Sequence, residues 1–451
     1  GLTFTAPALG ALDGGARSDR CGRRHNITTL AIIFLLGALG TTFAPTVGMV
    51  YLFRFVLGFA VGAASATVPI YLAESSPKRI RGTVVAIDQF MIVTGQLLAF
   101  TMNAVINAAH GGPQITVRRN GNADPLGITP GPHSWDEVLG LQTSKGGPLD
   151  ETAYHAFLDN LVISSGNGAA WRWMLVLCSI PAIALWIGIR LMPESARWYL
   201  SKGRLTDAIG VLKRVRDEAK DGPIQDEIEE MLAAQRHEKQ DAHQGHALAH
   251  VWRTPWLRKL LFVGIFLAIV NQATGVNTVM YYAPKVLEYA GMTTSASITA
   301  QVGNGVMSVI GAAAGLWLVS RFSRRSLLIF DVTAVGAILL AIAATFHHAI
   351  ASHIADGTTP PPWAPYLVLV LMAVFMLVVQ STNGTVVWTM LGEMFPSHVR
   401  GVMNGTAIFF MWIVNAAITF TFPAMMAGVG GRGASLGFGR RHLGIAAVRG
   451  R

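Results

Sequence analysis

The sequence has 451 residues, of which 52% are hydrophobic and 13% charged, and its net charge is +10. Soluble domains carry roughly 25% charged residues, so most of this chain is expected to lie in a non-aqueous solvent. The basic residues gather beside apolar runs, a pattern that orients membrane helices, so the positive charge does not indicate a nucleic-acid partner. The two cysteines exclude a disulfide framework.

The apolar runs predict about ten membrane spans, since a spanning helix needs about 20 apolar residues. In chain order the predicted spans are 1–16, 27–46, 50–73, 83–108, 171–191, 258–289, 296–319, 327–347, 364–390 and 402–427. The first run is short, and it begins at Gly1, which predicts that an earlier segment is missing. Gly275 and Pro284 interrupt one run, so that span is expected to end in a bent segment.

Lys and Arg predict which side of the membrane each loop faces. The basic connections are 17–26, 74–82, 320–326 and 394–401. The connections without Lys or Arg are 47–49, 290–295 and 348–363. The two kinds alternate along the chain, so the basic set is predicted to be cytoplasmic and the protein to be multi-pass in the plasma membrane.

Two long polar segments interrupt the spans. Residues 109–170 are rich in Gly, Asn, Pro and Asp and are predicted to form an extracytoplasmic insertion with little regular structure, apart from a short helix at 150–162. Residues 193–257 are predicted to be a cytoplasmic linker, with helices at 206–219 and 224–240 where acids and bases alternate. Its histidines are His237, His243, His246 and His250. Their spacings fit no standard metal site, so no metal is predicted.

A charged motif recurs in the two halves of the chain. Both Glu74–Gly82 and Glu393–Gly401 read E-x-x-P-x-x-x-R-G, and each follows an apolar run. Such repetition is typical of transporters built from duplicated helical bundles. The predicted parts are an N-terminal bundle (1–192), the linker (193–257), a C-terminal bundle (258–427) and an irregular basic tail (428–451). Within the spans we find no nucleophile–base pair and no metal-ligand set, so an enzyme is not predicted and no cofactor is expected.

Five motifs resemble signatures of the sugar porter family in the major facilitator superfamily. Gly15–Arg24 resembles G-x-x-x-D-R-x-G-R-R, and Pro69–Gly82 resembles P-x-Y-x-x-E-x-x-P-x-x-x-R-G. Pro193–Trp198 resembles P-E-S-P-R-W, with Ala196 in place of the second proline. Asn271–Tyr282 resembles Q-Q-x-x-G-x-N-x-x-x-Y-Y, and Trp388–Gly401 resembles W-x-x-x-x-E-x-F-P-x-x-x-R-G. The resemblance implies an all-α membrane protein with two pseudo-symmetric bundles, in which this chain carries about ten of twelve spans and lacks the first and last.

A sugar site needs amides, which donate and accept hydrogen bonds, and an aromatic side chain to cover the ring. The candidates within the spans are Gln89, Gln96, Asn271, Gln272, Asn277, Asn304, Trp388, Trp412 and Asn415. The resemblance implies sugar contacts for Gln89, Gln96, Gln272, Asn277, Trp388 and Asn415. The alternative is that these amides form hydrogen bonds that only hold helices together.

Four residues of the predicted spans depart from the family pattern. Asn271 replaces a glutamine, and Met411 occupies a position that is glutamine in some relatives. Asn383 stands where some relatives carry a tryptophan, and Thr385 replaces a proline. The last change predicts a milder break in the 364–390 helix.

Charged residues of alternating sign lie at the predicted cytoplasmic helix ends: Glu74, Arg81, Glu194, Arg197, Glu393 and Arg400. Together with Asp19, Arg20 and Arg24, the resemblance implies a network of ion pairs that latches the two bundles in an outward-open state. The alternative is simple orientation by positive charge. Ser320 and Ser323 replace the Asp and Gly of the second-half copy, so that half of the latch is expected to be weaker.

Proton coupling has two candidate residues. Arg54 matches an arginine that, in proton-coupled relatives, neighbours an aspartate on the first helix. Asp88 is a carboxylate inside an N-terminal-half span beside Gln89, and we take it as a hypothetical proton carrier. A buried, hydrogen-bonded aspartate is the alternative.

The predicted function is transport of a hexose, pentose or polyol by alternating access, coupled to protons, by a monomer in the lipid bilayer. Two alternatives remain open: a membrane sugar sensor that does not transport, and a non-functional truncated fragment.

Overall fold

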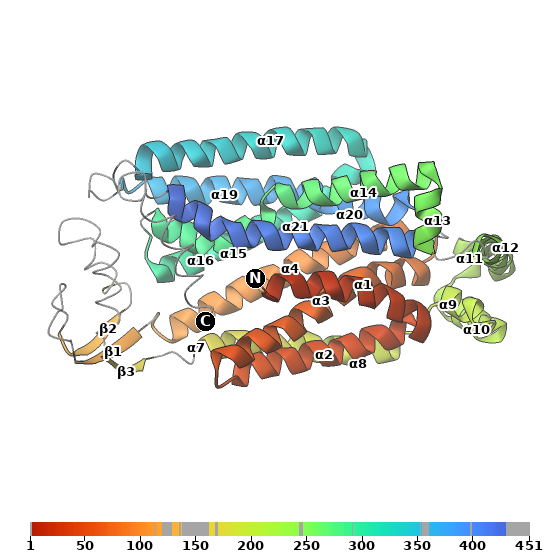
Figure 1. Ribbon diagram of the computed structural model, residues 1–451, viewed down its shortest axis with the longest axis horizontal. Helices are drawn as coiled ribbons and strands as arrows, with labels where there is room; N and C mark the ends of the chain where they lie inside the picture. The colour runs from red at the N-terminus through yellow and green to blue at the C-terminus, as the bar shows by residue number, and fades with distance from the viewer. Residues whose placement is uncertain are drawn as a thin grey trace.

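The computed structural model describes residues 2–112, 114–119, 129–134, 137, 162–166, 170–242, 247–290, 292–351, 353, 360–396 and 399–429. The long helices run side by side along one direction, with a small sheet at one end and the short linker helices at the other (Figure 1). The two polar segments of the sequence therefore lie at opposite ends of the helical body.

The first half is a group of packed helices. They are α1 (Leu2–Cys21), α2 (Arg23–Phe43), α3 (Val47–Ser75), α4 (Arg81–Ala109), α7 (Ala170–Val176) and α8 (Ser179–Leu191). The helix α3 packs against both α1 and α2. A Cβ at Gly62 would lie 1.9 Å from the backbone oxygen of Pro7, so glycine is what lets α1 and α3 approach this closely. The helix α1 runs through the predicted loop 17–26, which is reduced to a turn at Gly22.

The second half repeats the arrangement with two broken helices. Its elements are α14 (Pro255–Ala273), α15 (Val276–Tyr289), α16 (Thr294–Arg321), α17 (Arg324–Thr345), the π-helix η1 (Phe346–Ala351), α19 (Ala364–Ser381), α20 (Asn383–Met394) and α21 (Arg400–Val429). Gly275 separates α14 from α15 with φ of 80°, so the interruption predicted there is confirmed. Thr382, with φ −116° and ψ −79°, separates α19 from α20.

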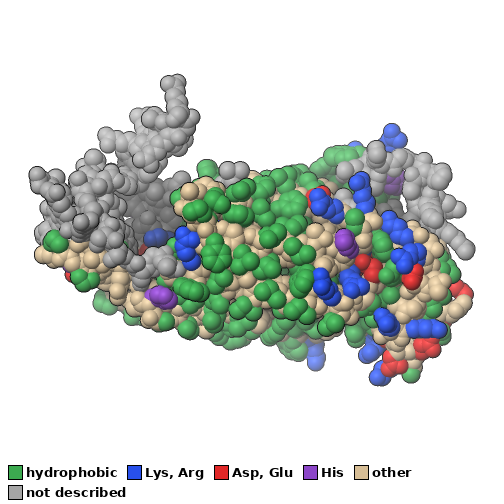
Figure 2. Space-filling model, turned by 90° about the horizontal axis from the view of Figure 1, so that it is seen from below, with side chains coloured by type: hydrophobic (Ala, Val, Ile, Leu, Met, Phe, Trp, Pro, Cys, Tyr) green, Lys and Arg blue, Asp and Glu red, His purple; other side chains and the backbone are tan. Residues whose placement is uncertain are grey.

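Within the described residues, nine stretches are long and apolar enough to cross a membrane. The predicted short span at 1–16 is not among them, although α1 packs in the bundle against α3. Large apolar side chains point outward from these stretches, among them Leu36, Phe266 and Leu340, which are 59%, 65% and 73% exposed. In Figure 2 hydrophobic side chains cover the middle of the molecule and charged side chains gather at one end. The body therefore has the surface of a multi-pass membrane protein.

The linker folds as helices, as predicted. They are α9 (Ala196–Ser201), α10 (Leu205–Val215), α11 (Glu218–Asp221), α12 (Ile224–Ala242) and α13 (Ala247–Arg253). Leu212, Ile224 and Ile228 belong to their shared apolar core. The buried Arg216 side chain donates to Glu227 at 2.9 Å and to the backbone oxygen of Ser75 at 2.8 Å, which ties the linker to the end of α3.

The prediction of little regular structure in 109–170 was wrong for the part that the structure describes. The strands β1 (Gln114–Arg119), β2 (Gly131–Ser134) and β3 (Val162–Gly166) form an antiparallel sheet in the order β2-β1-β3. β-branched residues recur through β1, a composition that favours strands. The helix predicted at 150–162 lies outside the described residues except for Val162, which begins β3. The tail from 430 onward is also outside them.

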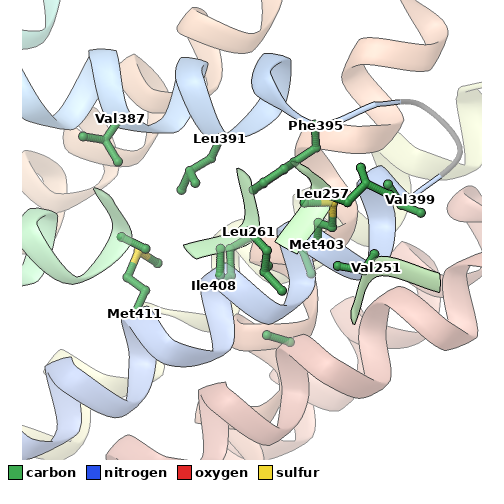
Figure 3. Close-up of a cluster of buried hydrophobic side chains, with 14 residues drawn as sticks. Val251, Leu257, Leu261, Val387, Leu391, Phe395, Val399, Met403, Ile408 and Met411 are labelled. Carbon is green, nitrogen blue, oxygen red and sulfur yellow. The ribbon is translucent and has the colours of Figure 1, made fainter. Parts of the chain in front are cut away.

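The two halves meet along two lines of contact. The helix α4 packs against α16 and α20, and α1 packs against α21. Near the linker, a buried apolar cluster joins Ala11 of α1 to Leu257, Phe395 and Met403 of the second half. Figure 3 shows the second-half members converging between α14, α20 and α21.

Candidate functional site

Amide side chains from three helices of the second half form one hydrogen-bonded network. Gln272 Nε2 donates to Asn271 Oδ1 at 3.0 Å. Asn277 Nδ2 lies 2.7 Å from Gln272 Oε1 and 3.1 Å from Asn415 Oδ1. The break at Gly275 sets the start of α15 so that Asn277 meets both Gln272 and Asn415. The structure therefore brings four of the predicted sugar-binding residues together.

Asn383 extends this network to a second broken helix. Asn271 Nδ2 donates to Asn383 Oδ1 at 3.2 Å, and Asn383 is 1% exposed. In the sequence Asn383 stood out only as a departure from a family pattern, and its place in the site was missed. Its signal in the sequence was an amide inside an apolar span, which is costly unless it has a polar partner.

Several predicted site residues hold buried polar atoms that no protein group satisfies. Gln96 Oε1, Asn304 Oδ1 and Trp412 Nε1 have no hydrogen-bond partner among the described residues. Nearly all buried polar side-chain atoms in proteins are paired. Two free acceptors and one free donor near the meeting of the halves are therefore suited to a ligand that both donates and accepts hydrogen bonds.

The first half reaches the second through glutamines of α4. Gln89 Nε2 lies 3.5 Å from Gln380 Oε1 of α19, and Gln96 Nε2 lies 3.3 Å from the sulfur of Met280. The first is at the distance limit for an N–H···O bond, and the second reaches a thioether sulfur, which is a weak acceptor, so these side chains remain available to a ligand. Gln380 was missed in the sequence, although it is an amide within a span and is 4% exposed.

Asn304 belongs to a neighbouring pair on α16. Its Nδ2 donates to Gln301 Oε1 at 3.2 Å, and Gln301 Nε2 donates to the backbone oxygen of Met280 at 2.7 Å. Gln301 was also missed, and the same signal would have found it. Because Met280 contacts both Gln301 and Gln96, this pair lies beside the first-half glutamines.

The two predicted aromatic residues lie against the apolar cluster that joins the halves. Trp388 of α20 and Trp412 of α21 are partly buried and pack on it. Met411, next to Trp412, is 1% exposed and belongs to the cluster itself (Figure 3). A sugar contact for either indole stays a prediction.

Glu194 caps a helix in the first half. Its carboxylate accepts the backbone N–H groups of Arg23 at 2.9 Å, Arg24 at 3.0 Å and Ser195 at 2.9 Å. Arg23 and Arg24 begin α2, where unpaired N–H groups and the helix dipole favour an anion. Gly22 has φ of 100°, and a Cβ there would meet Glu194 Oε2 at 2.5 Å, so only glycine fits this turn beside the carboxylate.

Glu74 and Arg24 add further ties within the first half. Arg23 Nε lies 3.2 Å from Glu74 Oε2, and Ser195 Oγ also donates to that carboxylate. The Arg24 guanidinium donates to the backbone oxygens of Ile189 at 3.2 Å and Arg190 at 2.7 Å, at the end of α8. Arg23 was not among the predicted residues, although it lies in the basic motif. These groups hold α2, α3, α8 and α9 together.

The other predicted charged residues are placed as follows. Arg20 is exposed, and Arg197 is half-buried with its Nε unpartnered. The side chains of Asp19, Arg81, Glu393 and Arg400 lie outside those that the structure describes. A latch between the two halves therefore stays a prediction.

Arg54 and Asp88 lie apart from the amide network. Arg54 is exposed near the start of α3, and Asp88 is half-buried on α4. Neither forms an ion pair among the described residues. Their role in proton coupling stays a prediction. Among all the residues that the structure describes, no group of three or more His, Cys, Asp or Glu residues could hold a metal ion.

The chain is similar in sequence and in structure to known transporters. Residues 2–118 and 154–441 match a family described as "Sugar (and other) transporter". The chain is 38% identical to the major myo-inositol transporter IolT of Bacillus subtilis (strain 168), over 95% of this chain and 76% of that protein. It is 30% identical to the galactose-proton symporter of Escherichia coli (strain K12), over 94% and 75% of the two chains. A solved structure of the proton:xylose symporter XylE matches with a TM-score of 0.67 at 22% identity, covering 94% of this chain and 77% of that one.

Proposed function

The chain belongs to the sugar transporter family, and on that premise we propose that it carries a neutral hexose or cyclic polyol across the membrane by alternating access, coupled to a proton. Family membership makes it a multi-pass plasma-membrane transporter with the major facilitator fold rather than an enzyme, and it favours transport over the sensor and fragment interpretations.

The observation that carries the choice of substrate class is the set of unpaired polar atoms at the meeting of the halves. A hydroxyl group donates one hydrogen bond and accepts two. A ring bearing several hydroxyls can therefore donate to the acceptor Gln96 Oε1 and accept from the donor Trp412 Nε1. A charged substrate would need a compensating charge, and the network of Asn271, Gln272 and Asn277 offers only neutral amides.

Two relatives narrow the substrate class. One is named as a myo-inositol transporter and the other as a galactose-proton symporter. Both substrates are neutral six-membered rings bearing hydroxyl groups, which fits a site built of neutral amides. The second name also supports proton coupling in this chain.

Alternating access requires contacts between the halves that can open and close. The contacts of α4 with α16 and α20, and of α1 with α21, are those that would separate. The weak contact of Gln89 with Gln380 crosses this boundary. We propose that bound substrate replaces it by bridging Gln89 to the second-half amides, which couples occupancy to closure of the halves.

The decisive experiment is counterflow in proteoliposomes containing the purified protein. Vesicles are loaded with unlabelled myo-inositol, galactose or xylose, and entry of the same labelled compound is followed. We expect saturable exchange of at least one of them, and none of a charged hexose phosphate. Protein-free vesicles and vesicles with the Gln272→Ala variant serve as controls. Equal entry of all compounds into all vesicles would contradict the proposal.

A further inference from the structure

Asp331 is a buried carboxyl group for which the proposed sugar site has no use. It lies in α17, which packs against α19 and α20, and it is 1% exposed. Asp331 Oδ1 is 2.6 Å from the hydroxyl oxygen of Thr382, the residue at the break between these two helices. The backbone N–H of Asn383, the first residue of α20, lies near this carboxyl group.

The Thr382 hydroxyl is within hydrogen-bonding distance of two acceptors. Its Oγ1 is 2.6 Å from Asp331 Oδ1 and 2.7 Å from the backbone oxygen of Val378. A hydroxyl has one proton and cannot donate along both short contacts. Threonine in a helix commonly donates to the carbonyl four residues earlier, which is Val378. Both contacts are then hydrogen bonds only when Asp331 is a protonated acid that donates to Thr382.

The surroundings of Asp331 also fit the neutral acid. A buried charge is costly unless it is paired, and among the described residues no ion pair includes Asp331. The charged and titratable residues on α17 and on the elements packed against it are Arg324, Arg325, His347, His348, Tyr366 and Glu393. The arginines precede Asp331 by six and seven residues, about 9–10 Å along the helix, and are exposed. The two histidines and Tyr366 lie more than ten residues from Asp331 or Thr382, and the Glu393 side chain lies outside the described residues.

We propose that Asp331 is a proton-binding site of the transporter, loaded in this conformation and emptied when movement of α20 opens it to water. On release, the carboxylic O–H bond breaks, its proton passes to water and a carboxylate remains. The Thr382 hydroxyl then turns from Val378 to that carboxylate. The inference rests on the proposed proton-coupled transport and names the residue that carries the proton.

Hydrogen bonds connect this site to the amide network. Asp331 contacts the Thr382 hydroxyl, the next residue is Asn383, and the Asn383 side chain accepts from Asn271, which accepts from Gln272. A change at Asp331 therefore moves the start of α20, on which Asn383 lies. By linkage, sugar binding then changes the proton affinity of Asp331 by the same factor as the proton changes sugar affinity.

The test compares sugar accumulation with sugar counterflow in proteoliposomes. A proton gradient of one pH unit drives about tenfold accumulation when one proton accompanies each sugar. We expect the Asp331→Asn variant, which keeps a hydrogen-bonding side chain of the same shape, to lose accumulation and to retain counterflow, which needs no net proton movement. Asp226→Asn, an exposed aspartate on α12, is the matched control and should accumulate about tenfold.

A second measurement does not depend on transport. Infrared difference spectroscopy of the folded protein in lipid should show the carbonyl stretch of a protonated carboxylic acid, and this band should be missing in Asp331→Asn. Full accumulation by Asp331→Asn, or an unchanged infrared band, would overturn the inference, as would loss of accumulation in Asp88→Asn alone. Counterflow without accumulation in the wild type would contradict proton coupling, and no counterflow at all would contradict the proposed function. The infrared band tests Asp331 in either case.

Discussion

The two halves of the molecule use their polar side chains in different ways. In the first half, charged groups hold helix ends together: Glu194 caps α2, Glu74 pairs with Arg23, and Arg24 binds the last carbonyls of α8. In the second half, neutral amides beside the helix breaks bond one another: Asn271 bonds Asn383, and Asn277 bonds Asn415. One set is suited to fixing a scaffold and the other to binding a neutral ligand.

The difference shows how a duplicated fold can divide its work. The second-half loop that matches the charged loop of the first carries Ser320 and Ser323. Ser323 caps α17 because its hydroxyl oxygen accepts the backbone N–H of Ser326 at 3.2 Å. This cap is neutral and lies within the loop itself. The helix breaks at Gly275 and Thr382 in the second half each place amides at a helix start, whereas the break between α7 and α8 in the first half places none there. We infer that the second half holds most of the substrate contacts.

The largest expected effect comes from removing amides of the second half. Replacing Gln272 with Ala removes one hydrogen-bond partner of Asn271 and one of Asn277. Gln272 is also a proposed sugar contact, and a sugar hydroxyl left unpaired in the site costs about 1–3 kcal/mol, so sugar affinity should fall by about fivefold to 150-fold. Isothermal titration with the relative's substrate, myo-inositol, would measure it. Gln225→Ala, at an exposed position of α12, is the matched control, and an equal loss there would contradict a specific role.

A smaller effect of a different kind is expected at Glu194. Glu194→Gln keeps the shape but removes the charge that faces the start of α2. A charge at a helix start contributes about 0.3–2 kcal/mol, so the thermal unfolding temperature in detergent should fall while sugar affinity stays the same. Glu218→Gln, exposed on α11, is the control. A loss of affinity without a loss of stability would break the comparison between scaffold and site.

Much of this arrangement could be predicted from the sequence. Apolar run length predicted the spans, and Gly275 predicted the break between α14 and α15, because both signals are local. The cost of amides within spans marked Gln272, Asn277 and Asn415, which the structure brings together.

What could not be predicted depends on contacts between distant segments. Asn383 joins Asn271 across more than a hundred residues, and Thr385 in place of a proline suggested only a milder break. The break between α19 and α20 lies at Thr382, whose hydroxyl is within hydrogen-bonding distance of Asp331 on α17. The sheet of the insertion pairs strands separated by segments without a clear pattern, so composition alone suggested irregular structure. Each missed feature has a partner that local sequence does not identify.

The smallest expected effect comes from restoring the acid of the second-half loop with Ser320→Asp. Ser320 is exposed in the last turn of α16, and its hydroxyl donates to the backbone oxygen of Trp317. An aspartate there would face the negative end of α16 and the positive start of α17 at once, so the two dipole effects oppose each other. Exposed charges contribute about 0–1 kcal/mol, and the described residues of this loop have no counterpart of Glu194 to complete a network. We therefore expect thermal unfolding and sugar affinity to change little. A clear gain in stability would mean that one charge can rebuild the scaffold of the first half in the second. The two halves would then differ less in their use of charged groups than their contacts indicate.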